Sequence, residues 1–203
     1  MHADGKLLGW IANGNVGSMG NNVRELVRPE DLKGLKMRAF SRRAAIWQES
    51  LGSSSIVISS ADMYTALQRG TVDGAMTAIT SFTSRKIMEV VKYVTYPPSM
   101  ANIFFSVVIT KKKWDSLEPA AQEIVQAAAL DVQAWSVAES QKEDRLALDE
   151  LGKRSNLKLT MLRSEQEKPW TATNKVALEG FIKDSGEIGN RLLDLIQQTA
   201  PKS

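Results

Sequence analysis

The stretch DLKGLKMRAFSRRAAIWQESLGSSSIVIS, residues 31–59, predicts a strand, a helix and a second strand in succession. Its first part alternates apolar with polar or aromatic side chains after Gly34, which is typical of a strand. Its middle part places apolar side chains at helical spacing and stops at Gly52, and its last four residues are mostly β-branched. Residues 60–80 predict another helix and another strand. This order is typical of parallel strands joined by crossover helices, and therefore of an α/β fold.

Three segments downstream extend this pattern. Residues 102–110 form a nearly continuous apolar run, which is typical of a strand that is covered on both faces. Residues 118–151 predict a helix of about 45 Å, at a rise of about 1.5 Å per residue. Such a helix is longer than one small domain is wide, which indicates a brace between two lobes. Residues 157–162 predict a last strand, which amphipathic helices follow.

Two other segments complete the expected order of elements. NGNVGSMGNN, residues 13–22, follows a predicted strand at 6–12 and is rich in Gly and Asn, which is typical of a loop. In residues 81–94 four apolar side chains recur at mostly helical spacing, which predicts a helix.

The composition excludes several classes of function. The 203 residues include 26 Lys and Arg against 23 Asp and Glu, and the mild net charge of +3 argues against a nucleic-acid binder. The chain has no Cys and a single His, His2, which excludes a disulfide framework, a thiolate nucleophile, a Ser-His-Asp triad and a two-His metal site. No run approaches the roughly 20 apolar residues that span a bilayer, and the first residues lack the pattern of a signal peptide. The absence of Cys, together with a single His, excludes most common hydrolytic mechanisms.

A basic residue near the end of the first predicted strand allows two interpretations. By alternation, Arg38 shares a face with Lys36 and Phe40. On the local pattern alone, the favoured interpretation is an edge strand whose charged side faces solvent. The alternative is an anion-binding site.

Four segments, taken in order, resemble the DctP-type solute-binding proteins of tripartite ATP-independent periplasmic (TRAP) transporters. They are DLKGLKMRAF (31–40), LGSSSIVISSADMYTALQRGTVDGAMT (51–77), EVVKYVT (89–95) and KKKWDSLEPAAQEIVQAAA (111–129). The resemblance runs from about Gly5 to the end of the chain and rests on the order and spacing of the segments. It implies an α/β, type II-like periplasmic binding protein fold, in which two lobes are braced by a long helix and close over a small organic acid.

The resemblance also implies a division of the chain. Proteins of this family normally begin with a signal peptide and an N-terminal segment that builds much of the first lobe, and we expect that part to be absent here. Residues 1–203 are therefore expected to form one truncated bilobal unit with an incomplete first lobe. Its expected parts are mainly the second α/β lobe at 10–100, a hinge strand with its return at 101–116, the bracing helix at 117–151, and a C-terminal strand with helices at 152–203.

The resemblance assigns a ligand-binding role to Arg38 and draws attention to four more residues. In the family, the arginine at this position forms a bidentate salt bridge with the ligand carboxylate, and a planar guanidinium suits two carboxylate oxygens. Thr77 stands where some members place Asn, and it either donates a hydrogen bond to the ligand or faces solvent. Ser60 stands where a relative has an aromatic ring, and it either borders the pocket or caps a helix. Phe40 either lines the cleft or packs in the core, and Asn102 either touches the ligand or caps a turn.

The function that the resemblance implies is the capture of a small carboxylate in the periplasm and its delivery to the membrane subunits of a TRAP permease, by hinge closure. We expect no cofactor, no metal, no catalytic residue and no nucleic-acid partner. Two alternatives stay open: a non-transporting binding or assembly module that a partner chain completes, as in a homodimer, and an α/β enzyme. No clustered acid–base or metal motif supports the enzyme. The sequence does not name the carboxylate.

Overall fold

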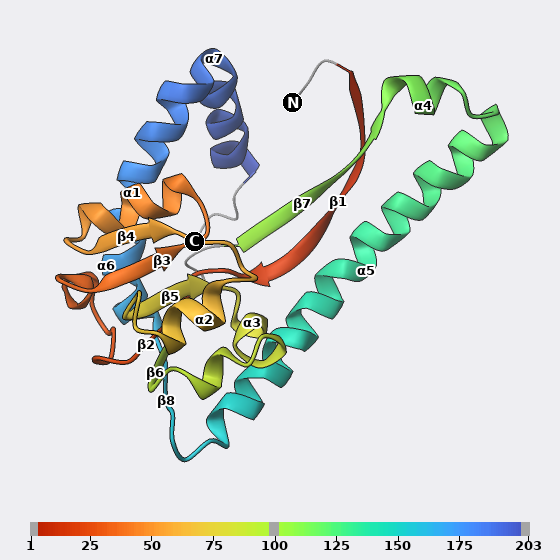
Figure 1. Ribbon diagram of the computed structural model, residues 1–203. Coiled ribbons are helices and arrows are strands. Elements are labelled where there is room, and N and C mark those ends of the chain that lie inside the picture. Colours follow the sequence, from red (N-terminus) through yellow and green to blue (C-terminus); the bar gives the residue numbers. More distant parts are fainter. Residues whose placement is uncertain (1–3, 98–101, 200–203) are drawn as a thin grey trace.

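The computed structural model of this chain describes residues 4–97 and 102–199. A six-stranded sheet with helices on both faces makes up the larger part, and a two-stranded ribbon runs beside a long helix away from the sheet (Figure 1). The strands of the sheet lie in the order β4-β3-β5-β2-β6-β8. Their bounds are Ser18–Asn21 for β2, Lys36–Ala39 for β3, Ser54–Val57 for β4, Gly74–Thr77 for β5, Tyr93–Tyr96 for β6 and Lys158–Met161 for β8.

The sheet is mixed rather than entirely parallel. β3 runs parallel to β4 and β5, and β6 runs parallel to β8, whereas β2 is antiparallel to both of its neighbours, β5 and β6. The prediction of a loop at residues 13–22 is wrong, because β1 (Gly5–Asn15) extends into this segment and β2 follows it. Gly and Asn are weak strand formers, so β2 depends on pairing with two neighbours rather than on local propensity.

Helices cover both faces of the sheet, and the two larger apolar clusters of the described residues lie between helices and sheet. One core, which includes Phe82 and Val94, lies under α2, α3 and η2, and the other, which includes Trp47 and Trp170, lies under α1 and α6 (Figure 1). The helical elements of this part are η1 (Pro29–Leu32), α1 (Arg42–Ser50), α2 (Met63–Gln68), α3 (Ile79–Ser84), η2 (Ile87–Glu89), α6 (Ser164–Thr173) and α7 (Lys175–Thr199), of which η1 and η2 are 3-10 helices. α7 kinks at Gly186, whose backbone leaves the helical region.

The prediction of one helix at residues 81–94 is also wrong. α3 ends at Ser84, a single 3-10 turn follows, and the segment finishes in strand β6. Lys86 adopts a left-handed conformation with φ of 57°, which stops the helix. The apolar residues beyond it are buried by a turn and a strand, so their nearly helical spacing is coincidental.

The ribbon consists of β1 and β7 (Asn102–Thr110), which pair antiparallel, and α5 (Pro119–Gly152) lies along β1 (Figure 1). Side chains of α5 hydrogen-bond to the free edge of β1: Gln126 Nε2 donates to the carbonyl of Leu8 at 2.7 Å, and Ser136 Oγ accepts from the amide of Ala12 at 3.0 Å. The prediction of a long helix at 118–151 is confirmed. This helix satisfies a strand edge that would otherwise be open to pairing.

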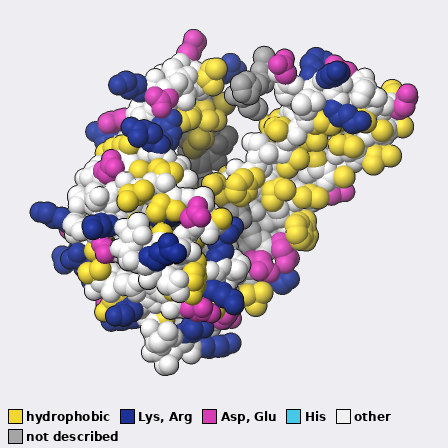
Figure 2. Space-filling view, viewed as in Figure 1, with side chains coloured by type: hydrophobic (Ala, Val, Ile, Leu, Met, Phe, Trp, Pro, Cys, Tyr) yellow, Lys and Arg dark blue, Asp and Glu magenta, His cyan; other side chains and the backbone are white. Residues whose placement is uncertain are grey.

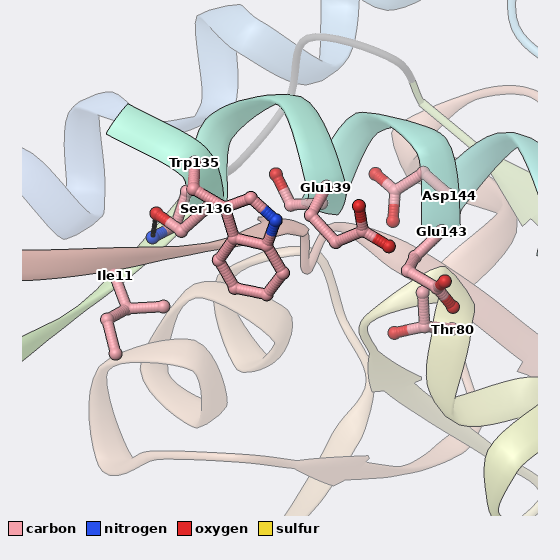
Figure 3. A pocket seen from close by; sticks show the side chains of 9 residues that line it. Ile11, Thr80, Trp135, Ser136, Glu139, Glu143 and Asp144 are labelled. Carbon is pink, nitrogen blue, oxygen red and sulfur yellow. Dashed lines mark hydrogen bonds between the residues drawn. The ribbon is translucent and has the colours of Figure 1, made fainter. Parts of the chain in front are cut away.

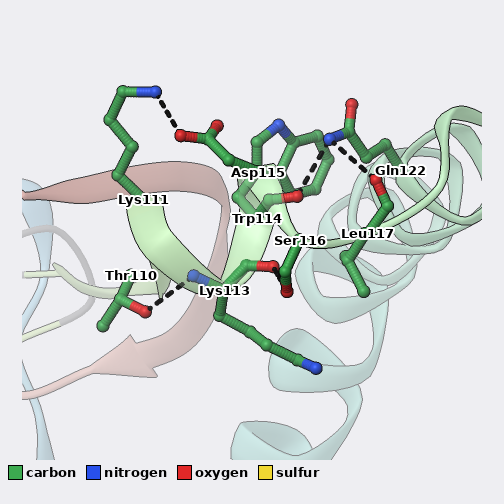
Figure 4. A network of polar contacts seen from close by, with 8 residues as sticks. All are labelled: Thr110, Lys111, Lys113, Trp114, Asp115, Ser116, Leu117 and Gln122. Atoms are coloured by element: carbon green, nitrogen blue, oxygen red, sulfur yellow. Dashed lines mark hydrogen bonds and ion pairs between the residues drawn. The ribbon is translucent and has the colours of Figure 1, made fainter.

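The corner between β7 and α5 is fixed by polar contacts around the short helix α4 (Lys111–Asp115) (Figure 4). Lys111 Nζ and Asp115 Oδ2 form an ion pair at 2.6 Å. Gln122 Nε2, from the first turn of α5, donates to the carbonyls of Trp114 and Leu117 at 2.9 and 3.4 Å. The hydrogen bonds of Gln122 thereby link the end of α4 to the start of α5.

The expectation that residues 102–110 are covered on both faces is wrong for this chain. Phe104 and Phe105 are 57% and 54% exposed, and Val108 is 56% exposed. Hydrophobic side chains gather over the ribbon and α5 on the face shown in Figure 2. β7 pairs with β1 in this ribbon, and these exposures show that its apolar run does not indicate a strand that is covered on both faces.

Within 4–97 and 102–199, no helix is both long and apolar enough to cross a bilayer.

Candidate anion-binding site

A cavity of about 540 Å³ lies at the carboxyl ends of the three parallel strands β4, β3 and β5. Val16, just before β2, and Ile103 and Phe105 of β7 also line it. The carboxyl edge of parallel strands is where α/β sheets bind ligands, because loops diverge there and leave a crevice. The cavity thus lies between the sheet and the ribbon.

Arg38 lies inside the sheet rather than at its edge. Its strand, β3, is flanked by β4 and β5, and the residue is only 2% exposed. Its guanidinium donates three hydrogen bonds: Nε to the carbonyl of Ile58 at 2.8 Å, Nη1 to the carbonyl of Met76 at 2.8 Å, and Nη2 to Ser60 Oγ at 3.2 Å. The interpretation of Arg38 as a solvated surface charge is therefore wrong.

The guanidinium of Arg38 has no carboxylate partner among the described residues. It takes part in no salt bridge there, and no Asp or Glu lines the cavity. Burial, with a further contribution from the charge of Arg85, lowers the pKa of Arg38, although an arginine stays protonated at neutral pH. Three of its five N–H groups are used internally, which leaves two for a ligand. A buried, oriented and uncompensated cation favours an anion in the cavity.

Thr77 and Phe40 also line this cavity. Thr77 is buried at the end of β5, and the pairing of Arg38 with Ala75 places Thr77 on the same face of the sheet as Arg38. Phe40 is half-buried, and it both borders the cavity and packs against the core that contains Trp47. Phe40 thus borders the cavity and packs against the core at once, and its role as a ligand contact stays a prediction.

The structure describes the side chain of Ser60 but not that of Asn102. Ser60 lines the cavity and accepts the hydrogen bond from Arg38, while the turn before α2 is capped by Ser59, whose Oγ accepts from the amide of Asp62 at 3.2 Å. The N-terminus of α2 itself has no side-chain cap, so Ser60 does not cap this helix. The backbone of Asn102 pairs with Asn15 at the start of β7, and its side chain lies outside the described residues.

The sequence interpretation missed three polar residues of the cavity: Ser59, which follows β4, and Ser81 and Arg85. Ser81 and Arg85 stand four residues apart on and just after α3, which places them on one side of the helix. Arg85 Nη1 donates to the carbonyl of Ser60 at 3.4 Å. An isolated arginine near the end of a short helix has no sequence pattern of its own, so only the packing of α3 identifies it.

A separate, acidic cavity of about 270 Å³ lies between β1, α3 and α5 (Figure 3). Glu139, Glu143 and Asp144 of α5 line it together with Thr80. Within the described part of the chain, no group of three or more His, Cys, Asp or Glu is arranged to hold a metal ion. Because like charges repel, this cavity is unsuited to a carboxylate ligand.

Asp144 is buried where α5 meets the end of β1. It is 8% exposed, and its Oδ2 accepts from the amide of Asn15 at 3.2 Å, whereas its Oδ1 has no hydrogen-bond partner among the described residues. Burial raises the pKa of Asp144, and the hydrogen bond from Asn15 opposes this in part. A Cβ at Gly14, where φ is +67°, would lie 2.7 Å from Asp144 Oδ1, so a glycine is required there.

Replacing Asp144 with asparagine is expected to flatten the pH dependence of stability. Because the native pKa is raised, the native state binds the proton more tightly than the unfolded chain, so this group loses stabilising effect as the pH rises through the native pKa. The amide carries no charge and still accepts from Asn15, so the free energy of unfolding should rise by about 1 kcal/mol at pH 7. Urea unfolding between pH 4 and pH 7 measures the difference, which should shrink toward pH 4. An equal gain in Asp131→Asn, on an exposed part of α5, would contradict this explanation.

Comparison of the sequence with known proteins gives a consistent result. Residues 1–184 match the family model of DctP, bacterial extracellular solute-binding protein, family 7. A solute-binding protein of Albidiferax ferrireducens is 29% identical over 199 residues, which cover 95% of this chain and 57% of that protein. The C4-dicarboxylate-binding periplasmic protein DctP of Rhodobacter capsulatus is 25% identical over 146 residues, which cover 71% of this chain and 44% of that protein. The chain thus spans about half the length of these relatives.

Solved structures share the fold. A TRAP periplasmic solute-binding protein of Rhodoferax ferrireducens with bound malonate matches with a TM-score of 0.84 at 26% identity, over 97% of this chain and 62% of that chain. One of Ralstonia eutropha with bound (S)-2-acetolactate matches with a TM-score of 0.80 at 30% identity, over 92% of this chain and 60% of that chain. The expected class, an α/β fold like that of bilobal periplasmic binding proteins, is confirmed.

Proposed function

This chain belongs to the DctP family of bacterial extracellular solute-binding proteins, and we propose that it captures a small organic acid in the periplasm and delivers it to the membrane subunits of a TRAP permease. The observation that supports the proposal most directly is the state of Arg38. Its guanidinium is buried, held by three hydrogen bonds, and faces a cavity that no carboxylate of the described chain lines.

In the proposed complex, Arg38 receives the ligand carboxylate. Hydrogen bonds to a charged group contribute roughly 1.5 to 3 kcal/mol each, which is enough to select a carboxylate over a neutral solute. Thr77 offers one hydroxyl, and Phe40 offers an apolar wall. Because the internal hydrogen bonds fix the guanidinium before the ligand arrives, little conformational entropy is lost on binding.

Transport follows from closure of the bilobal fold. The cavity is bordered by the sheet on one side and by Ile103 and Phe105 of the ribbon on the other. A ligand that contacts both sides stabilises the closed form relative to the open form, and a permease can distinguish the two forms. The family consists of solute-binding proteins, and a carrier of this kind needs no catalytic residue.

Isothermal titration calorimetry tests the proposed function. We expect the purified chain to bind at least one of malonate, succinate, (S)-2-acetolactate and galactonate, with a dissociation constant on the order of micromolar or below. Malonamide, which has the shape of malonate without its charges, should not bind. Absence of binding to every acid, or equal binding of malonamide and malonate, would contradict the proposal.

A second candidate function, an assembly module that a partner chain completes, is favoured by the exposed apolar side chains of the ribbon. Phe104, Phe105 and Val108 are each more than half exposed on β7. Burial of such side chains against a second copy of this chain would be favourable by roughly 25 cal/mol for each Å² of apolar surface. Size-exclusion chromatography with light scattering distinguishes the candidates: a dimer supports assembly, and a monomer that binds a carboxylate contradicts it.

A further inference from the structure

We propose that Arg85 is a second anion contact of this cavity and that it selects ligands with two acidic groups over ligands with one. The proposal rests on the proposed function, because it concerns the same cavity and the same ligand. It assigns to one residue of this chain, Arg85, the selection of small dianions over monoanions.

Two guanidinium groups hydrogen-bond to Ser60. Arg38 Nη2 donates to Ser60 Oγ at 3.2 Å, and Arg85 Nη1 donates to the carbonyl of the same residue at 3.4 Å. Both arginines line the cavity. Ser60 therefore brings the two guanidinium groups together in the cavity lining without neutralising either charge.

The local charge is unbalanced. Among the described residues, neither Arg38 nor Arg85 takes part in a salt bridge, and the lining of the cavity contains no Asp or Glu. Burial and, to a lesser extent, the charge of Arg85 lower the pKa of Arg38, which agrees with two guanidinium groups that hydrogen-bond to the same residue. A monoanion leaves one of the two charges uncompensated, whereas a dianion balances both.

The two arginines differ in solvent exposure and in the number of their hydrogen bonds. Arg38 is buried and has three fixed hydrogen bonds, whereas Arg85 is exposed and has one long hydrogen bond, so most of its donors are available. Ser81, one turn before Arg85, lines the same cavity, so this side of α3 faces the cavity. An exposed charge is partly screened by water, so Arg85 should adjust selectivity while Arg38 provides the main anchor.

Paired ligands test the role of Arg85. Malonate, succinate and glutarate each have a monoamide, malonamate, succinamate and glutaramate, of nearly the same shape but with one charge fewer. Calorimetry on the wild type should show that the best diacid binds at least about tenfold tighter than its monoamide. In Arg85→Gln this preference should fall to within about threefold, while the affinity for the monoamide stays close to the wild-type value. Arg85→Lys, which keeps the charge, should retain part of the preference.

A matched control separates a contact from a change in net charge. Arg69→Gln removes an exposed arginine that does not line the cavity, and it should leave the preference for the diacid unchanged. If carboxylates bind the wild type but the preference is absent, or survives in Arg85→Gln, the assignment of Arg85 is wrong while the proposed function stands. If no acid binds the wild type, the proposed function fails and the role of Arg85 fails with it.

Discussion

Replacing Arg38 with alanine is expected to weaken carboxylate binding by at least about 100-fold. The side chain offers two N–H groups to a ligand beyond its three internal hydrogen bonds, and two charge-assisted hydrogen bonds are together worth roughly 3 kcal/mol or more. The variant also loses the positive charge that attracts an anion to the cavity, because the other lining residues are neutral apart from Arg85. Calorimetry with the tightest-binding acid measures the effect.

The alanine variant also changes the fold locally, so it needs companions. It leaves the carbonyls of Ile58 and Met76 without the donors that Arg38 supplies, and each unsatisfied carbonyl costs about 1 to 3 kcal/mol. Arg38→Lys keeps the charge and one donor group but not the planar fork, and we expect intermediate affinity and stability. Arg42→Ala, an exposed site at the start of α1 outside the cavity, should bind as the wild type does. Wild-type affinity in Arg38→Ala would refute the assignment of the anchor.

The alternation in residues 31–40 was sufficient to place Arg38 on one face of its strand. It did not decide whether that face is exposed to solvent or buried. Burial depends on β4 and β5, which pair with β3 from elsewhere in the chain, and on the cavity at their carboxyl ends. The order of four segments and the length of the helix at 118–151 carried that information, because both report on the arrangement of distant elements. Local polarity alone favoured the wrong interpretation.

The errors have a common physical cause. β2 contains Gly20 and Asn21, which are weak strand formers, and β6 begins inside a run whose apolar spacing resembles that of a helix. In both cases pairing across the sheet overrides local preference. The exposed side chains of β7 show the converse, since a continuous apolar run indicates burial only where another element covers it.

The resemblance pointed to Arg38, Thr77 and Ser60, and local strand patterns alone did not. The structure places all three around one cavity at the carboxyl ends of parallel strands. Their roles as ligand contacts stay predictions. Arg85 reaches the cavity from α3, so its position depends on how closely that helix approaches the sheet.

Replacing Gly20 with alanine is expected to lower the free energy of unfolding by about 3 kcal/mol, a large share of the stability of a typical domain. A Cβ at Gly20 would lie 2.9 Å from Phe82 Cζ and closer still to Phe82 Cε1. Phe82 is fully buried, so its ring has no free space to enter. Alanine would therefore force α3 away from β2, although strand propensity alone would favour it over glycine. Urea unfolding followed by tryptophan fluorescence measures the loss.

Two variants isolate the steric cause. Gly152→Ala makes the same chemical change at the end of α5, where a Cβ would meet nothing within 4 Å, and it should be neutral or stabilising by up to about 1 kcal/mol. Phe82→Leu removes part of the ring that the new Cβ would meet. The double variant Gly20→Ala with Phe82→Leu should therefore be more stable than the sum of the two single effects by about 1 kcal/mol or more. Strict additivity would show that the ring of Phe82 is not what excludes a side chain at Gly20.

The same packing connects Gly20 to selectivity. Phe82 lies on α3 between Ser81, which lines the cavity, and Arg85, which follows the helix. A shift of α3 moves Arg85 but leaves Arg38 in its strand, held by the carbonyls of Ile58 and Met76. We therefore expect Gly20→Ala, where it remains folded, to lose preference for a diacid over its monoamide more than it loses affinity for the monoamide. Equal loss of both affinities would instead indicate that the edge of the sheet unfolds. In that case Gly20 would have no specific effect on the preference for a diacid.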